Sequence, residues 1–163
     1  MLENAAWHHY MARNFERAWE YCERCFELAP DFAWAHFIVG LLDVQGGRLD
    51  NAKTAFEKGE GAGFMKGYIG YAIGASSDHE KARELLEDVE QEVASGKGSS
   101  YSTALVHFGL GDIERCLDAL EASTEEQPAI LAVTAWMNVD PFWYPFRDDP
   151  RFQDLLRRMN FPE

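Results

Sequence analysis

The chain repeats one short pattern four times, and this internal repeat limits its fold more than any other feature. Residues 13–18 (RNFERA) align with residues 47–52 (GRLDNA), and residues 77–82 (SDHEKA) align with residues 111–116 (GDIERC). Within each pair the offset is 34 residues, whereas the second and third copies are 30 residues apart. Repetition at a period of roughly 20–50 residues is typical of chains built from stacked units that contact their neighbours.

Two sets of small residues recur in phase with this pattern. The first set is Ala6, Gly40, Gly70 and Ala104, and the second set is Ala18, Ala52, Ala82 and Cys116. A small residue at each position allows two helices to approach closely, and the glycine or polar residues between the sets favour a tight turn with a capped helix start. Each copy is therefore predicted to form one helical hairpin.

This pattern resembles the tetratricopeptide repeat over residues 1–125. The resemblance implies an all-α chain in which about four helical hairpins stack into a right-handed α-α superhelix, a tetratricopeptide solenoid. Residues 126–163 would then supply C-terminal capping helices, because a solenoid needs a cap over its last apolar face. We expect residues 1–163 to form a single domain. The resemblance is specific for the fold and says little about function.

Glycines and capping residues predict where individual helices begin and end. Three glycines within residues 59–63 end a helix that starts near Leu49. The 30-residue step therefore marks a shortened helix and a local bend, which is either a harmless deletion or a hinge. A further helix is expected over about residues 78–94, with Ser77 and Glu80 forming a capping box at its start.

The residues that follow the fourth copy depart from the repeat. A helix is expected over about residues 128–138, with Trp136 and Met137 buried. Residues 139–146 (VDPFWYPF) are expected to form an aromatic turn, which its prolines prevent from being helical throughout. Asp149 is expected to cap a last helix, because a proline follows it in the position that suits a first turn.

This last helix is expected to bury one face and to end on two basic residues. Its apolar residues are Phe152, Leu155, Leu156 and Met159. Arg157 and Arg158 suit the negative C-terminal end of the helix dipole. Asp140, Pro141 and the stretch DPRFQDLLRRM over residues 149–159 resemble the end of tetratricopeptide regions that follow kinase, cyclase or winged-helix domains in bacterial proteins. This resemblance implies a regulatory or scaffolding module.

The charge balance argues against several classes of partner. With 28 acidic and 15 basic residues the net charge is −13, which disfavours nucleic acid and anionic membrane surfaces. No apolar run approaches the roughly 20 residues of a membrane span, and the N-terminus lacks the pattern of a signal peptide. Three cysteines without disulfide-framework spacing indicate a reducing compartment. We therefore expect a cytoplasmic protein without membrane insertion.

No arrangement of residues predicts catalysis, a cofactor or a metal site. Cys22 and Cys25 form a single CxxC where the repeat needs small apolar residues, whereas a zinc site needs about four ligands. His8 and His9 point about 100° apart on a helix and do not chelate one ion easily. No nucleophile elbow, phosphate-binding loop or dinucleotide fingerprint is present. We expect no enzyme activity, no cofactor and no metal.

The resemblance also predicts a partner-binding face, because the first helix of each tetratricopeptide hairpin lines the concave side of the stack. The expected partner-binding residues are Trp7, Tyr10, Trp34, Phe37, Leu41, Tyr71, Tyr101 and Phe108. These residues lack the Lys, Asn and Arg clamp with which one subgroup of the family binds the C-terminal carboxylate of chaperone peptides. Two interpretations remain open. The face is either an open groove for an apolar peptide or helix, or it is covered by the C-terminal segment or a neighbouring domain.

The leading functional hypothesis is a protein-interaction or scaffold module that binds a partner protein or peptide on this face. The alternative is a non-catalytic regulatory region at the C-terminal end of a larger bacterial signalling enzyme or transcription regulator. A third hypothesis is self-association into a homo-oligomer through the aromatic or the acidic surface.

Overall fold

In the part of the chain that the structure describes, helices joined by turns and short loops are the regular elements. The computed structural model describes residues 1–59, 64–126 and 136–159. These residues form nine α-helices and one 3-10 helix, and none of them forms a strand, so the all-helical class expected from the sequence is confirmed. The elements are α1 (Leu2–Met11), α2 (Phe15–Leu28), α3 (Ala33–Gln45), α4 (Leu49–Lys58), α5 (Met65–Ala75), α6 (His79–Ala94), α7 (Ser100–Gly109), α8 (Ile113–Glu125), η1 (Pro141–Phe146) and α10 (Pro150–Arg158).

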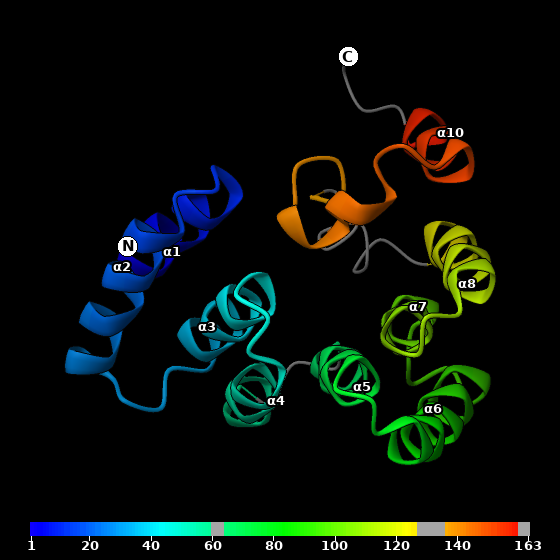
Figure 1. Cartoon of the computed structure of the whole chain (residues 1–163), viewed down its shortest axis with the longest axis horizontal. Helices are drawn as coiled ribbons and strands as arrows, with labels where there is room; N and C mark the ends of the chain where they lie inside the picture. The colour runs from blue at the N-terminus through cyan, green and yellow to red at the C-terminus, as the bar shows by residue number, and fades with distance from the viewer. Residues whose placement is uncertain (60–63, 127–135, 160–163) are drawn as a thin grey trace.

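The first eight helices pack as four consecutive hairpins. Helix α1 packs on α2, α3 on α4, α5 on α6, and α7 on α8. The second helix of one hairpin also packs on the first helix of the next, in the pairs α2–α3, α4–α5 and α6–α7. Figure 1 shows the hairpins following one another around an arc, with residues 136–149 on its inner side. The predicted hairpin for each copy of the repeat is therefore confirmed.

All four hairpin turns contain one residue with a left-handed backbone conformation at the same position. Arg13, Gly47, Ser77 and Gly111 have positive φ angles of 60°, 69°, 76° and 75°, and each is the first residue of its copy of the repeat. The next residue precedes the second helix, and in three copies its side chain caps that helix through the amide three positions later. The predicted capping box is wrong, because Asp78 and not Ser77 accepts the bond from the Lys81 amide.

Small residues lie where helices cross, as the repeat predicted. Ala6, Ala18, Ala52, Ala82, Ala104 and Cys116 are completely buried. A methyl group at Gly40 would collide with the ring of Phe56, and one at Gly70 would lie 2.5 Å from Cγ2 of Val106. These contacts leave no room for a side chain, so the small residues set the spacing between neighbouring helices. Helix α4 ends at Lys58 as expected, whereas residues 60–63 lie outside the described residues.

The C-terminal residues agree with the sequence predictions in part. Most of the helix expected over 128–138 lies outside the described residues, and residues 136–139 form a turn. Met137 is buried as expected, but Trp136 is 44% exposed, so its predicted burial is wrong. The ring of Trp136 packs edge-on against Trp7, with 6.0 Å between ring centroids.

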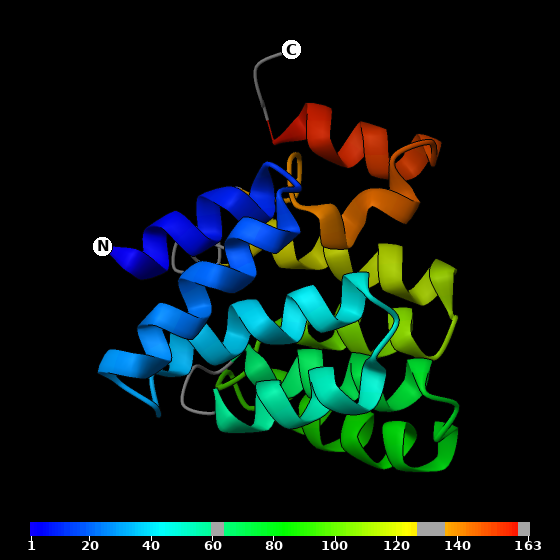
Figure 2. The same ribbon diagram turned by 60° about the vertical axis from the view of Figure 1, so that its left-hand side comes forward.

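Residues 139–146 contain a 3-10 helix rather than an irregular turn. Helix η1 begins at Pro141 and accommodates Pro145 inside it, because a 3-10 helix this short makes few hydrogen bonds that a proline could remove. The predicted cap of the last helix is confirmed, since Asp149 accepts hydrogen bonds from the amides of Arg151 and Phe152. Figure 1 shows α10 next to α8, at the opposite end of the arc from α1 and α2, and Figure 2 shows η1 running beneath α10.

Candidate protein-interaction face

The eight residues predicted to bind a partner lie on helices α1, α3, α5 and α7. Of these, Tyr10, Phe37, Leu41 and Tyr101 are buried, and Trp7, Trp34, Tyr71 and Phe108 are half-buried. We call the surface formed by these eight residues and Tyr68 the concave face. Its rings contact one another from helix to helix: Trp7 lies 5.5 Å from Trp34, Phe37 lies 5.1 Å from Tyr68, and Tyr68 lies 6.4 Å from Tyr101, between ring centroids.

We call residues 136–159 the C-terminal strap. Its residues 136–146 lie against the part of this face formed by Trp7, Tyr10, Tyr68, Tyr71, Tyr101 and Phe108. Phe142 in η1 is 2% exposed and lies among three rings of the face. Its centroid is 5.2 Å from Tyr68, 4.7 Å from Tyr71 and 5.6 Å from Phe108, and all three contacts are edge-to-face. Edge-to-face packing places the positive edge of one ring against the negative face of another. The strap therefore fills the face with complementary aromatic contacts.

Trp143 adds a second aromatic anchor beside the first. Its side chain is completely buried, stacks on Phe108 with 5.8 Å between centroids, and donates a hydrogen bond from Nε1 to the hydroxyl of Tyr101 at 3.2 Å. Phe146 also contacts Phe108, at 4.7 Å. Because the indole N–H has a partner, the buried tryptophan carries no unsatisfied donor.

Three tyrosine hydroxyls of the face form hydrogen bonds where the strap packs against it. They belong to Tyr10 on α1, Tyr68 on α5 and Tyr101 on α7. The hydroxyls of Tyr68 and Tyr101 lie 3.0 Å apart, within hydrogen-bonding distance, and the hydroxyl of Tyr10 donates to Oδ1 of Asp140 at 3.0 Å. Burial raises the pKa of all three tyrosines, so the hydroxyls stay protonated and able to donate.

Asp140 is a buried carboxylate within this aromatic environment. It is 4% exposed and also accepts a hydrogen bond from the amide of Phe142 at 2.8 Å, which caps η1. Burial raises the pKa of Asp140 to about 6, although the two hydrogen bonds and the nearby Arg147 act in the opposite direction. Arg147 itself donates to Oδ1 of Asn138 at 3.0 Å, inside the strap.

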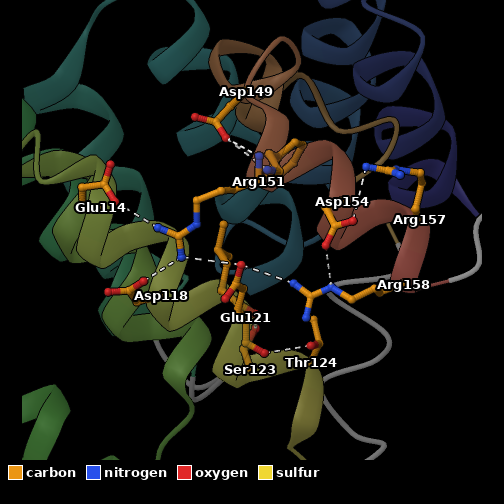
Figure 3. A network of polar contacts seen from close by, with 12 residues as sticks. Glu114, Asp118, Glu121, Ser123, Thr124, Asp149, Arg151, Asp154, Arg157 and Arg158 are labelled. Carbon is orange, nitrogen blue, oxygen red and sulfur yellow. Dashed lines mark hydrogen bonds and ion pairs between the residues drawn. The ribbon is translucent and has the colours of Figure 1, made fainter.

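Ion pairs hold the end of the strap against α8. Arg151 of α10 lies 3.0 Å from Glu114, 2.7 Å from Asp118 and 3.5 Å from Glu121, and Arg158 lies 3.2 Å from Glu121 (Figure 3). Arg151 and Glu121 are half-buried and the other three groups are exposed, so solvent and salt screen these pairs and each contributes little. The aromatic contacts therefore dominate the docking of the strap, and the ion pairs fix where α10 lies.

The first hairpin also contacts the strap from its turn. The guanidinium of Arg13 lies 3.8 Å from the ring centroid of Tyr144, at the distance of a cation–π contact. Together with the bond between Tyr10 and Asp140, this contact joins the beginning of the chain to its C-terminal part. The strap therefore bridges the first hairpin and the last.

Sequence reasoning missed Tyr68 and did not identify the residues of the strap that occupy the face. Those residues are Asp140, Phe142, Trp143 and Phe146. A signal for them exists in the sequence, since residues 141–146 contain four aromatic residues and two prolines, a composition too apolar for an exposed turn. Of the two interpretations of the face, the one in which the C-terminal segment covers it describes the structure.

The remaining candidate groups offer no reactive site among the described residues. The thiols of Cys22 and Cys25 are free and buried, and burial raises the pKa of Cys22 to about 12, which keeps it unreactive. His9 stacks on Tyr21 at 5.3 Å rather than facing a second ligand. Within residues 1–59, 64–126 and 136–159 there is no cluster of three or more histidine, cysteine or acidic side chains placed to hold a metal.

Among the helices that the structure describes, none has the length and apolar character that crossing a bilayer requires. Comparison with protein-family models, curated proteins and solved structures gave no match to this chain. The resemblance to tetratricopeptide repeats therefore stays a prediction, which depends on the repeated residues of this sequence.

Proposed function

We propose that this chain is a protein-interaction module of the tetratricopeptide type that binds a partner protein or peptide on its concave face and is not itself an enzyme. One observation carries the proposal: residues 140–146 already lie on this face in the manner of a bound peptide. They contact it through the rings of Phe142 and Trp143 and through two hydrogen bonds that cross between the strap and the face.

The residue types of the face support this role. Tryptophan and tyrosine contribute most to binding energy in protein interfaces, because each buries a large rigid surface and carries one polar group. A binding site is typically apolar with a few polar groups that fix the orientation of the ligand. The hydroxyls of Tyr10, Tyr68 and Tyr101 are such groups, since they are buried among aromatic rings.

A partner on this face must compete with the strap. The face is accessible in the fraction of molecules from which the strap has withdrawn, and the apparent affinity for a partner falls in proportion to that fraction. The pairs of Arg151 with Glu114, Asp118 and Glu121 lie at the rim, where a substitution can weaken the strap without creating a cavity. The module is therefore closed in the absence of a partner.

Capture of proteins from a lysate of the source cells tests this function. The baits are the tagged full-length chain, its R151E variant, and R157E as a matched control, because Arg157 pairs with Asp154 inside its own helix. We expect R151E to retain one or more proteins at a higher level than wild type and R157E do. The proposal fails if no protein is retained beyond a bait-free control, or if R151E and R157E behave alike.

The regulatory alternative has one structural observation in its favour. The end of the first hairpin exposes Leu28 (79%) and Phe32 (37%), and with Cys25 and Ala29 these residues line an apolar hollow. Exposed apolar patches of this kind are typical of contacts with another domain or protein. An in-frame catalytic or DNA-binding domain upstream in the gene would favour this alternative, in which the chain regulates the attached domain.

A further inference from the structure

We infer that the partner of the concave face carries a segment with the chemistry of residues 140–143: a side chain with a hydrogen-bond acceptor oxygen such as Asp or Asn, then a proline, then two aromatic side chains in a tight turn. This inference rests on the proposed function and names the class of partner that the face fits. It follows from three places on the face where the strap makes contacts of different chemistry, and from the backbone geometry that brings them together.

The first place receives a carboxylate. Tyr10 is completely buried, and its hydroxyl donates to Asp140, which is itself buried. A buried hydroxyl surrounded by rings needs an acceptor, because an unsatisfied polar group in such a place is costly. When the strap withdraws, Tyr10 loses this acceptor. A partner that supplied an apolar group at this point would not replace this acceptor, whereas an Asp or Asn side chain would restore the bond.

The second place receives an aromatic ring. Tyr68, Tyr71 and Phe108 surround Phe142 with centroid distances between 4.7 and 5.6 Å, and each presents its ring at a steep angle to that of Phe142. The interplanar angles are 73°, 63° and 89°. Three rings at such angles favour a flat aromatic side chain over a branched aliphatic one, because the edge-to-face contacts depend on a ring quadrupole.

The third place receives an aromatic side chain with a hydrogen-bond donor. Trp143 stacks on Phe108 with 21° between the ring planes, and its Nε1 donates to the hydroxyl of Tyr101. Tyr101 is completely surrounded by protein, and its hydroxyl lies beside that of Tyr68. An indole meets both requirements at once, since it offers a large face for stacking and a single N–H for the bond.

The backbone of η1 sets the spacing of these three groups. Asp140 caps the 3-10 helix by accepting from the amide of Phe142 at 2.8 Å, and Pro141 occupies the first helical position. Proline restricts the backbone to the conformation of a first helical turn before binding, which lowers the entropy lost on docking. A partner segment that lacked this proline would present the same side chains at a higher entropic cost.

A labelled peptide of residues 137–149 (MNVDPFWYPFRDD) provides the probe. Its binding to the full-length chain is followed by fluorescence anisotropy, with wild type, R151E and F142A as receptors. F142A removes the strongest internal competitor and leaves Tyr68, Tyr71 and Phe108 in place. R157E and F32A are the matched controls, because Arg157 does not contact α8 through an ion pair and Phe32 lies at the far end of the first hairpin.

We expect F142A to bind this peptide at least about tenfold more tightly than wild type, R157E and F32A do, because a larger fraction of open molecules lowers the apparent Kd in proportion. R151E should bind it more tightly than these controls by a smaller factor, roughly threefold, because ion pairs on the rim contribute little. A peptide that carries F142A and W143A should show no binding to any receptor. A peptide that carries D140A should bind more weakly than the parent peptide to both opened receptors.

Hydrogen exchange of the amides in residues 141–146 makes the result decisive. If R151E and F142A both expose these amides and neither binds the peptide, the inference is wrong. If neither variant exposes them, the strap is a fixed part of the core, the face has no room for a partner, and the inference is again wrong. Each of these outcomes is measured on the chain of residues 1–163.

The failure of this inference can be distinguished from the failure of the proposed function. The unlabelled peptide is added to the lysate capture with R151E. Release of the captured protein by the parent peptide, but not by the peptide with F142A and W143A, supports the inference. A captured protein that the parent peptide does not displace leaves the proposed function standing and overturns the inference. Absence of any captured protein overturns the proposed function itself.

Discussion

The hydroxyl of Tyr10 donates a hydrogen bond to the carboxylate of Asp140 across 130 positions of sequence, and both side chains are buried. Tyr10 belongs to the first helix and Asp140 to the C-terminal strap, so this bond connects the two ends of the arc of hairpins. A buried carboxylate is tolerated because it accepts from Tyr10 and from the amide of Phe142. This pair gives the strap a contact whose strength depends on ionisation.

Asp140→Asn should stabilise the protein at pH 8 and have little effect at pH 4. Burial raises the pKa of Asp140 from its ordinary value of 3.8 to about 6. Because the folded-state pKa is raised, the protonated form favours the fold, and this contribution is complete below pH 3.8 and lost as the pH rises through about 6. Asparagine keeps an acceptor oxygen without the charge. We expect a gain of about 1–3 kcal/mol in unfolding free energy at pH 8.

Urea unfolding of the wild type and D140N at pH 4 and pH 8 measures this difference. Comparison at each pH cancels the contribution of every other titrating group. A variant that is less stable than wild type at both pH values would show that the charge of Asp140 is favourable in its site. The direction expected from burial would then be wrong.

Tyr10→Phe should destabilise the protein, and more strongly at pH 8 than at pH 4. The substitution leaves the amide of Phe142 as the remaining donor to Asp140 among the contacts described, so an ionised carboxylate is less well satisfied. We expect a loss of about 1–3 kcal/mol, measured by the same unfolding experiments. Y144F is the matched control, since Tyr144 is 55% exposed and should change stability little. Equal losses for both variants would contradict the role given to Tyr10.

Arg151→Glu should loosen the strap in a salt-dependent way. The new carboxylate would face Glu114, Asp118 and Glu121, whose attraction to Arg151 it replaces by repulsion. We expect hydrogen exchange in residues 141–159 to be faster than in wild type at low salt, and the difference to shrink in about 1 M salt, where the screening length is about 3 Å. R157E carries the same change of charge and should leave exchange unaltered. An effect that persists in high salt would indicate a steric and not an electrostatic cause.

The sequence could predict the hairpins because their determinants are local. The turn and the small crossing residue recur within each copy, and a side-chain cap recurs in three of the four copies. In the third copy the cap is Asp78 and not the expected Ser77. The segment that covers the concave face could not be predicted in this way. Phe142 contacts Tyr68 and Tyr71, which lie more than 70 positions earlier in the sequence. Periodicity reports which face of a helix is apolar and does not say what buries it.

The same limit explains the two residues that were placed wrongly or not at all. The sequence predicts a buried Trp136, yet Trp136 is 44% exposed and packs edge-on against Trp7. Tyr68 was not recognised as part of the face, although it is completely surrounded and bonded to Tyr101. Their positions depend on the strap, whose path no local pattern specifies.

Ser77→Gly should stabilise the protein, because Ser77 has a left-handed backbone conformation, and glycine occupies the equivalent position in two of the other three hairpin turns. Its φ angle is 76°, against 69° for Gly47 and 75° for Gly111. A side chain in the left-handed region costs about 1–2 kcal/mol, and glycine removes that cost at the expense of a more flexible unfolded chain. We expect a net gain of about 0.5–1 kcal/mol in thermal or urea unfolding.

Gly47→Ser is the matched reverse substitution. No atom outside its neighbours lies within 4 Å of the position that a methyl group would take at Gly47, so any loss reports backbone strain and not a collision. We expect a loss of similar size to the gain at Ser77, because the two residues begin equivalent copies of the repeat and share one turn geometry. If both substitutions change stability in the same direction, the shared left-handed turn does not account for the choice of residue, and the equivalence of the four hairpin turns would have to be abandoned.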